Sequence, residues 1–383
     1  MSSLFEQLGE KRHSDPTKVV YVISDINKAL SFEWVSLGLK SRFDLSFILI
    51  TKMNSEFALF LKGNSLRFYE IADHQTRLKK WLAVFRILQH EKPAVVHTHL
   101  WQANLLGLSA SWLLRIKKRI YTRHHATVHY HEHPTGRKWD ILCNFLATDI
   151  IAISENIREI LLHWDKANPK KVKLIYHGFD FHYFAHVSGQ RMALLEAKYG
   201  LPEKDFPVIG VISRYMEWKG VQYIISAFQK ILDQFPTAKL ILANAHGSYE
   251  NEIRKQLTSL PHQSFIEIQF EEDLAALYAM FDVFVHVPVD PTVEAFGQTY
   301  IESLASGIPS IFTLSGIARE FVSHNYNAWV VDFKNSDQIV TGVTKILLDK
   351  NYRQMLKTNG LKSLQKFSLE ASVLALEKLY QVH

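Results

Sequence analysis

The chain has 383 residues, of which 47% are hydrophobic and 21% are charged. This composition is typical of a folded globular protein and excludes a disordered or fibrous chain, and the length favours two domains over one. A single cysteine, Cys143, excludes an intramolecular disulfide and leaves too few thiols for a cysteine-based zinc site.

The net charge of +6 is unevenly distributed along the chain. Residues 1–200 contain 28 Lys and Arg against 18 Asp and Glu, whereas residues 201–383 contain 16 against 20. The basic first half favours an acidic partner, either anionic lipid headgroups or a phosphorylated substrate. We expect no nucleic acid as a partner, because the sequence has neither a recognised nucleic-acid-binding motif nor a dense basic tract.

The sequence has no evident targeting or membrane-spanning segment. Its N-terminal residues lack an apolar stretch long enough for a signal peptide, and no later segment reaches 18 uninterrupted apolar residues. We therefore expect a cytoplasmic protein that approaches the inner face of the membrane only as a peripheral protein.

Short β-branched runs alternate with longer helical patterns throughout the chain. This alternation is typical of βαβ units and predicts two largely parallel sheets, one in each half. The strands expected in the first half are residues 18–24, 43–50, 94–100, 119–125, 149–154 and 171–178. The strands expected in the second half are residues 206–214, 238–244, 264–270, 282–288, 309–314 and 328–333.

The domain boundaries follow from the gap between these two series. Residues 179–205 lack a clear strand and contain Gly200 and Pro202, so we expect the linker there. The tail, residues 368–380, has a helical pattern with a partial capping box at Ser368. The predicted organisation is an N-terminal domain (1–200), a C-terminal domain (201–366) and a C-terminal helix (367–383).

The stretch VEAFGQTYIESLASGIP, residues 293–309, places Glu294 and Glu302 on either side of a Phe-Gly pair. On one continuous helix these residues would lie roughly 80° apart around the axis and about 12 Å apart along it, too far to hold one small group together. Gly297 indicates instead that a helix begins after Glu294, and Gly307 and Pro309 indicate where it ends.

The start of such a helix favours a bound anion. Its first backbone N–H groups and the helix dipole attract negative charge, and a glycine lets the anion approach closely. The motif therefore predicts a carboxylate, then anion-binding amides, then a second carboxylate, which fits an elongated ligand with hydroxyls at both ends and phosphate in the middle. The alternative is a helix with one solvated glutamate on each side.

A second motif, SRYMEWKG, follows the strand expected at 206–214. Arg214 and Lys219 flank a tight loop that closes with Gly220. Two cations at the end of a strand can reach a diphosphate, with Arg as a planar fork and Lys as a point charge. Taken alone, each would more often be a solvated loop charge.

With these motifs, the chain resembles the GT-B glycosyltransferases, specifically family 4 of the retaining nucleotide-sugar enzymes. The resemblance runs in consistent order from about His97 to Val331. Its elements are SRYMEWKG, HVPVDPTVEAFGQTYIESLASGIPSI with the E-x-F-G-x4-E signature, SGIAREFVSHNYNAWVV, IIAISENIREIL and IYHGFDFHYF. It implies a GT-B fold, an α/β architecture of two Rossmann-like parallel-sheet domains facing a central cleft. By the same resemblance, residues 1–200 would be the acceptor-side domain, residues 201–366 would bind the nucleotide sugar, and the C-terminal helix (367–383) would return to the first domain.

The resemblance also implies roles for individual residues. Glu294 would contact the donor sugar, Glu302 the ribose hydroxyls, and the amides near Gly297 the phosphates. The implied donor-binding residues are Arg214, Lys219, Glu294, Phe296, Gly297, Gln298, Thr299 and Glu302, and the implied catalytic residues are His124, Glu294, Arg214 and Lys219. In the family, a histidine at the end of the strand expected at 119–125 reaches the donor sugar; His124 matches it best, and His125 is the close competitor.

The first half departs from the family at its glycines. The family usually has a glycine-rich loop after its first strand, whereas the chain reads SDINKALSFEW at 24–34 and has no glycine after this strand until Gly38. The turns after two donor-domain strands read ANAHGSYENE and IQFEED, which leaves the base of the nucleotide open. A non-catalytic GT-B relative that binds a sugar nucleotide or a partner protein is therefore the main alternative function.

Five histidines lie between residues 124 and 133 in TRHHATVHYHEHP. The spacing of His129, His131 and His133 fits metal ligands and supports a third candidate, a metal-dependent hydrolase. No partnering Asp/His motif is evident, and the chain has no D-x-D, the metal-binding signature of the other major glycosyltransferase fold. We therefore expect no metal and no cofactor, with Arg214 and Lys219 in place of a divalent cation.

The sequence thus predicts a retaining glycosyltransferase of the hexosyl- or N-acetylhexosaminyltransferase class, in surface-polysaccharide or glycoconjugate assembly. Its expected partners are a nucleotide-sugar donor, a carbohydrate or lipid-linked acceptor, and an anionic membrane surface. The membrane expectation depends on residues 77–92 and 112–121, which interleave apolar and basic residues in the pattern of interfacial helices. Ordinary amphipathic helices with solvated lysines are the alternative.

Overall fold

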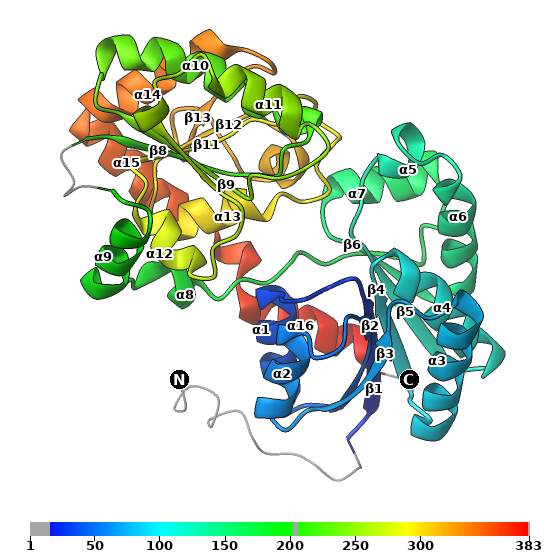
Figure 1. Ribbon diagram of the computed structural model, residues 1–383. Coiled ribbons are helices and arrows are strands. Elements are labelled where there is room, and N and C mark those ends of the chain that lie inside the picture. The colour runs from blue at the N-terminus through cyan, green and yellow to red at the C-terminus, as the bar shows by residue number, and fades with distance from the viewer. Residues whose placement is uncertain (1–15, 202–205, 382–383) are drawn as a thin grey trace. The chain divides into compact units, whose positions relative to one another are not determined.

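The computed structural model describes residues 16–201 and 206–381. The described chain forms two parallel β-sheets flanked by helices (Figure 1). The strand order is β3-β2-β1-β4-β5-β6-β7 in the seven-stranded sheet and β10-β9-β8-β11-β12-β13 in the six-stranded sheet. Each order reverses beside its central strand, β1 or β8, as in doubly wound folds. The predicted α/β class with two parallel sheets is confirmed.

All twelve expected strands are present, and the structure adds one more, β3. The strands of the first sheet are β1 Lys18–Ser24, β2 Asp44–Thr51, β3 Arg67–Ala72, β4 Val95–His99, β5 Lys118–Arg123, β6 Asp149–Ala152 and β7 Val172–Leu174. Those of the second sheet are β8 Val208–Ile212, β9 Lys239–Ala243, β10 Phe265–Ile268, β11 Val283–His286, β12 Ser310–Phe312 and β13 Trp329–Val330.

The helices connect these strands in the βαβ manner. The first half contains α1 Leu30–Leu39, α2 Glu56–Gly63, α3 Arg77–Glu91, α4 Trp101–Leu113, α5 Val128–His131, α6 Gly136–Leu146, α7 Glu155–Glu159, α8 Phe181–Ala185 and α9 Gly189–Lys198. The second half contains α10 Val221–Gln234, α11 Glu250–Leu257, α12 Leu274–Ala279, α13 Gln298–Ala305, α14 Ser336–Leu348, α15 Lys350–Lys362 and α16 Leu369–Tyr380.

One of the expected segments differs from the structure, and another contains helices. Residues 179–205, where a linker without a clear strand is expected, contain the helices α8 and α9. Residues 112–121, expected as an interfacial helix, contain only the end of α4, a turn and the start of β5. Alternating apolar and basic residues satisfy both helical and strand periods over so short a run, and here the strand is formed.

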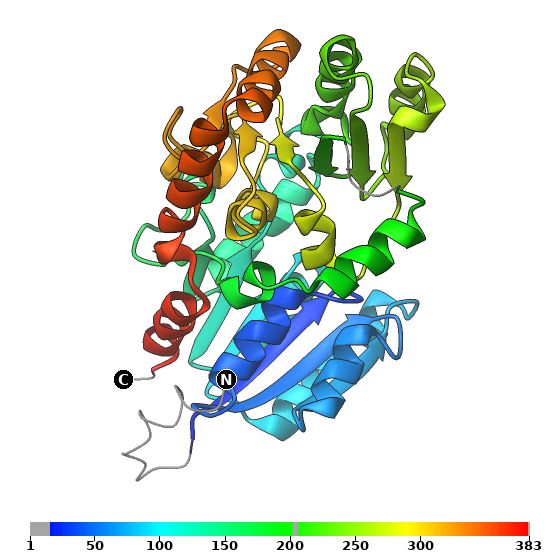
Figure 2. The ribbon, with the colours of Figure 1, turned by 90° about the vertical axis from the view of Figure 1, so that its left-hand side faces the viewer.

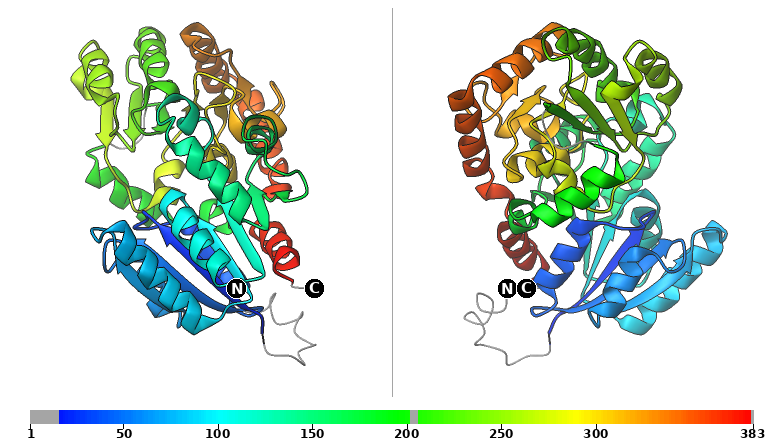
Figure 3. Two further views of the ribbon diagram at one scale, coloured as in Figure 1. Left: turned by 90° about the vertical axis from the view of Figure 1, so that its right-hand side faces the viewer. Right: turned by 60° about the vertical axis from the view of Figure 1, so that its left-hand side comes forward.

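Helices cover both faces of the first sheet. α1 and α2, blue in Figure 2, lie on one face, and α3 and α4 lie on the other (Figures 2 and 3). The core beneath α3 and α4 joins β1, β2 and β4 to these helices, with Val20, Val22, Ile48 and Val96 fully buried. Because both faces are covered, β1 is apolar on both faces rather than alternating.

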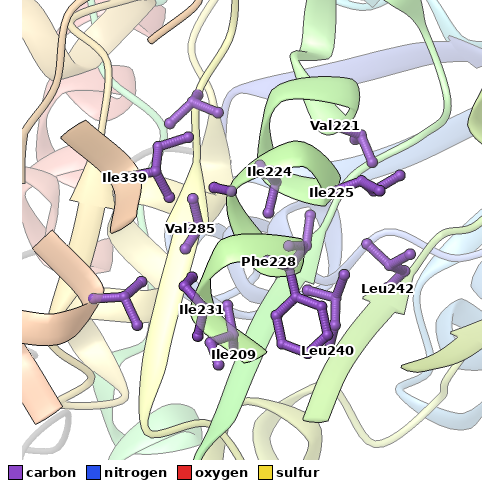
Figure 4. Close-up of a cluster of buried hydrophobic side chains, with 14 of the residues drawn as sticks. Ile209, Val221, Ile224, Ile225, Phe228, Ile231, Leu240, Leu242, Val285 and Ile339 are labelled. Atoms are coloured by element: carbon purple, nitrogen blue, oxygen red, sulfur yellow. The ribbon is translucent and has the colours of Figure 1, made fainter. Parts of the chain in front are cut away.

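The core of the second sheet lies beneath α10, α11 and α14. α10 contributes Val221, Ile224, Phe228 and Ile231 at helical spacing, and they pack on side chains of β8, β9 and β11 (Figure 4). This packing fixes the carboxyl ends of the strands, where the loops with the predicted donor-binding residues begin.

By internal contacts the chain divides into two units. One contains residues 1–122, 141–150 and 373–383, and the other contains residues 123–140 and 151–372. In the first unit, the Tyr380 hydroxyl of α16 lies 2.5 Å from the hydroxyl of Tyr21 and 2.5 Å from Nδ1 of His97. The domain boundaries expected after residues 200 and 366 stay predictions.

Candidate active site

The segment before α13 forms the turn that its glycine predicts. Gly297 has φ +88° and directly precedes the helix, so α13 begins where expected. Exposed Gln298 and half-buried Thr299 follow in the first turn. The Thr299 hydroxyl is buried and has no hydrogen-bond partner among the described residues. A helix start with an unsatisfied hydroxyl fits the predicted anion site.

Glu294 is 5% exposed and binds two side chains through one oxygen. Its Oε1 lies 2.5 Å from Nζ of Lys219 and 3.1 Å from Nε2 of His286. Burial alone would raise the pKa of Glu294, but the Lys219 ammonium and the His286 ring outweigh it and lower this pKa to about 2. Glu294 is therefore an ionised carboxylate at neutral pH.

The backbone of Glu294 is held by two side chains at the start of α7. Asn156 Nδ2 donates to the carbonyl oxygens of Glu294 (2.7 Å) and Thr292 (3.0 Å). Ser154 Oγ donates to the carbonyl of Ala295 at 2.6 Å. These bonds satisfy carbonyls that have no strand or helix partner, and they fix where the carboxylate of Glu294 points.

The loop after β8 brings the two predicted cations to the end of the sheet. Arg214 is exposed directly after β8, and Lys219 lies in the short turn that follows. Gly220 has φ +77°, and a Cβ there would lie 2.0 Å from the carbonyl oxygen of Val287. Only glycine fits this position, because the chain leaving β11 passes so close to it. The structure thus places Lys219 beside Glu294.

Glu302 has different surroundings from Glu294. It lies in the second turn of α13, is 7% exposed, and accepts a 2.9 Å hydrogen bond at Oε2 from the hydroxyl of Tyr278. Burial raises the pKa of Glu302 to about 7, since the hydrogen bond from Tyr278 offsets only part of the burial. No cation of the described residues forms an ion pair with it.

His124 joins the site through aromatic contacts. Its ring stacks on that of His177, with ring centres 5.5 Å apart, and the His177 ring meets Phe296 edge-on at 5.0 Å. His124 is therefore one ring away from the segment that carries Glu294. His125 has a different environment and hydrogen-bonds with Asp140. The geometry favours His124 over His125, and its contact with a sugar stays a prediction.

Sequence reasoning missed three residues of this site: His286, Tyr278 and Asn156. Asn156 lies in IIAISENIREIL, a motif quoted for the family resemblance without a role for this residue. His286 and Tyr278 contact the two glutamates only because β11 and α12 lie beside the segment 294–302 in space. No short-range pattern marks either residue.

Of the alternating histidines, His129 is buried, and the side chain of His131 lies outside the described ones. His133 is exposed. Among the described side chains, the cluster with donor atoms close enough for a metal consists of His125, His129 and Asp140. Asp140 is the acidic partner that no motif indicated.

Two family descriptions match the chain in succession. Residues 54–183 match Glycosyltransferase Family 4, and residues 195–363 match Glycosyl transferases group 1. The second match contains Arg214, Lys219, Glu294 and Glu302, and the first contains His124.

Individual relatives are distant but match along most of the chain. The capsular polysaccharide biosynthesis glycosyltransferase CapM of Staphylococcus aureus is 28% identical over 319 residues, 79% of this chain and 80% of CapM. An uncharacterised glycosyltransferase of Methanocaldococcus jannaschii is 25% identical over 292 residues, 74% of this chain and 73% of the relative.

The structure also resembles solved ones. The crystal structure of Anabaena HepE in complex with UDP-glucose superposes with a TM-score of 0.82 at 20% identity, over 95% of this chain and 100% of HepE. At this identity the likeness shows the shared GT-B fold. Since the two family descriptions match both halves of the chain in order and the fold agrees, the chain belongs to the family 4 glycosyltransferases of the GT-B fold.

Proposed function

We propose that the chain is a retaining glycosyltransferase that moves a hexosyl or N-acetylhexosaminyl group from a nucleotide diphosphate to a hydroxyl acceptor, in surface-polysaccharide or glycoconjugate assembly. The observation that carries this proposal is the ionised carboxylate of Glu294, held by Lys219 and His286 directly before the start of α13. The role of CapM in capsular polysaccharide biosynthesis and the UDP-glucose bound to HepE support it.

The donor would bind along the path from Glu294 to Glu302. Its sugar hydroxyls would meet Glu294, its diphosphate the amides after Gly297 and the hydroxyl of Thr299, and its ribose Glu302. Lys219 pairs with Glu294. A bound diphosphate would share this ammonium with the carboxylate, and exposed Arg214 would add its planar fork.

In the proposed transfer, the acceptor hydroxyl attacks the anomeric carbon from the same face from which the leaving group departs. The acceptor hydroxyl forms the new bond to the anomeric carbon while the bond to the diphosphate oxygen breaks, and that phosphate oxygen takes the acceptor proton. Arg214, Lys219 and the helix start stabilise the charge that develops on the leaving group. No divalent cation is needed, because these groups supply the positive charge. His124 would contact the donor sugar.

The acceptor is a carbohydrate or a lipid-linked carbohydrate, and we propose that the protein meets it at an anionic membrane surface. Among the described helices, none is long and apolar enough to cross a bilayer. α3 combines the exposed leucines Leu78 and Leu82 with the exposed cations Arg77 and Lys79, which fits an interfacial helix. Sedimentation with anionic but not neutral vesicles at low salt is expected, and equal sedimentation with both would refute the membrane part.

The experiment that tests the transferase activity is incubation with a panel of UDP-, GDP- and ADP-sugars, with release of nucleotide as the readout and Glu294→Gln as the matched control. We expect one donor to be turned over and the control to be nearly inactive. An α-configured donor should give an α-linked product, read from the anomeric NMR coupling. Binding of a sugar nucleotide without release, even with candidate acceptors, would instead indicate a non-catalytic protein.

A further inference from the structure

Three side chains outside the donor site direct one donor atom each toward a common point. His125 lies in the loop after β5, His129 in α5 and Asp140 in the second turn of α6. Oδ2 of Asp140 lies 3.2 Å from Nε2 of His125 and 2.7 Å from Nδ1 of His129. All three donor atoms lie within 4.8 Å of one another.

These donor types suit a zinc ion. Two imidazole nitrogens and one carboxylate oxygen are ligands of zinc, with bonds of about 2.0–2.2 Å. A tetrahedral site with such bonds separates neighbouring ligand atoms by about 3.3 Å. The distances from Oδ2 to the two nitrogens are 3.2 and 2.7 Å, so admitting the ion would lengthen them by roughly 0.1 and 0.6 Å.

A buried arginine orients the carboxylate of this group. Nη1 of Arg123 lies 2.9 Å from Oδ1 of Asp140, which leaves Oδ2 directed at the two imidazoles. Nε of Arg123 donates to the carbonyl of His125 at 3.1 Å, and Nη2 lies 3.5 Å from Oδ2 of Asp165. Arg123 thus lies beside two carboxylates, Asp140 and Asp165, and the three groups together keep one negative charge that a cation could balance. Outer partners of this kind hold metal ligands in place.

The site is enclosed on one side and open on the other. Asp140 and His129 are 3% and 8% exposed, whereas the side chain of His125 is 21% exposed. A Cβ on Gly136 would lie 2.4 Å from the His129 ring, so glycine at this position makes room for the ring. Three protein ligands with access from solvent leave a fourth position for water.

We propose that His125, His129 and Asp140 bind one zinc ion that ties together the segment from the end of β5 to α6. The ion would join three points of the segment that carries His124, with water as its fourth ligand, and it would take no part in the charge balance of the donor diphosphate. The proposal does not depend on the transferase activity. The competing interpretation is that the two imidazoles share Oδ2 by hydrogen bonds alone.

The test uses the full chain purified without a metal-affinity step. Zinc content is measured by mass spectrometry after dialysis, and Co²⁺ is then titrated into chelator-treated protein while its visible spectrum is recorded. We expect about one zinc per chain and the intense absorption of four-coordinate Co²⁺ with nitrogen and oxygen ligands. Substoichiometric zinc together with a weak, octahedral Co²⁺ spectrum would overturn the proposal without any variant.

Two variants locate the ion. His125→Gln removes the most accessible ligand and should raise the dissociation constant for Zn²⁺ by at least about 100-fold, beyond the effect expected of an outer partner. His133→Gln, an exposed histidine of the same segment, is the matched control and should bind Zn²⁺ like the parent. Equal weakening in both variants would indicate adventitious binding by a histidine-rich surface and refute the site.

Discussion

Glu294 and Glu302 are both buried and lie eight residues apart, yet their surroundings move their pKa values in opposite directions. A cation and an imidazole lower the pKa of Glu294 to about 2, whereas burial with a single hydroxyl partner raises that of Glu302 to about 7. Glu294 presents a fixed negative charge. Glu302 can gain a proton and both donate and accept hydrogen bonds. Two identical side chains thereby differ in charge and in the hydrogen bonds that they can form.

The largest expected effect separates the two carboxylates by kinetics. Glu294→Gln should lower kcat about 1,000-fold and change nucleotide affinity little, because it removes a charge that acts in the transition state. Glu302→Ala should weaken nucleotide binding by about 10- to 100-fold with a smaller effect on kcat. Steady-state kinetics and nucleotide titration measure both. Unchanged turnover in folded Glu294→Gln would refute its catalytic role.

The next largest expected effect is the loss of rate when Lys219, the cation beside Glu294, or Arg214 in the same loop is replaced. Lys219→Ala and Arg214→Ala should each lower the rate by about 30- to 1,000-fold, or about 2–4 kcal/mol of transition-state stabilisation. Arg214→Lys should recover only part of the loss, since an ammonium lacks the planar fork.

EDTA distinguishes these cations from a metal at the donor. The parent should keep nearly all its rate when EDTA is added to the assay. A rate that EDTA abolishes and Mg²⁺ or Mn²⁺ restores would contradict a donor site without metal. Restoration by Zn²⁺ alone would instead point to the site of His125, His129 and Asp140.

Only part of the contrast between the two glutamates could be predicted from the sequence. The spacing around Gly297 predicted the start of α13 correctly, because a glycine with positive φ and a helix start are local properties. The ion pair of Glu294 with Lys219 joins residues 75 positions apart. The resemblance implied that both residues bind the donor. Their direct contact arises because β8 and β11 are neighbours in the sheet, so that the loops after these two strands meet.

The same distinction between local and long-range information explains the fold. Strands buried on both faces, such as β1 and β8, are continuous apolar runs and were predicted. β3, one of the two edge strands of its sheet, was missed because it carries the polar residues Arg67 and Glu70, so its apolar pattern is weak. The helices α8 and α9 were missed because Gly200 and Pro202 drew attention to a break that lies just beyond α9.

The pH dependence of the free energy of unfolding tests whether the pKa of Glu302 is raised, in contrast to that of Glu294. The pKa of Glu302 is about 7 in the folded chain and has an ordinary value of 4.5. Because the folded chain holds this proton more tightly, Glu302 supports stability fully below pH 4.5, and this contribution is lost as the pH rises through 7. The difference corresponds to about 3 kcal/mol at most.

Glu302→Gln has no such proton to lose. Relative to the parent, its free energy of unfolding should therefore rise by about 2–3 kcal/mol between pH 4.5 and pH 9. Urea unfolding of both proteins without nucleotide, at a series of pH values, measures this gap. A gap that does not change with pH would show that Glu302 has an ordinary pKa.

The smallest expected effect tests whether His286 positions Glu294. Its ring is 1% exposed, and its Nε2 is the second partner of the same carboxylate oxygen that Lys219 binds. Burial is the main cause that lowers the pKa of His286, so the ring is neutral and donates from Nε2.

His286→Leu should lower kcat about 10- to 50-fold, the loss expected for one buried hydrogen bond to a charged group. His286→Gln keeps a donor near the same point and should recover most of the rate, with KM for the donor nearly constant in both. A purely structural role predicts instead that activity follows the folded fraction of each variant and that Gln, a poor fit to the apolar ring site between Phe284 and Tyr300, is no better than Leu.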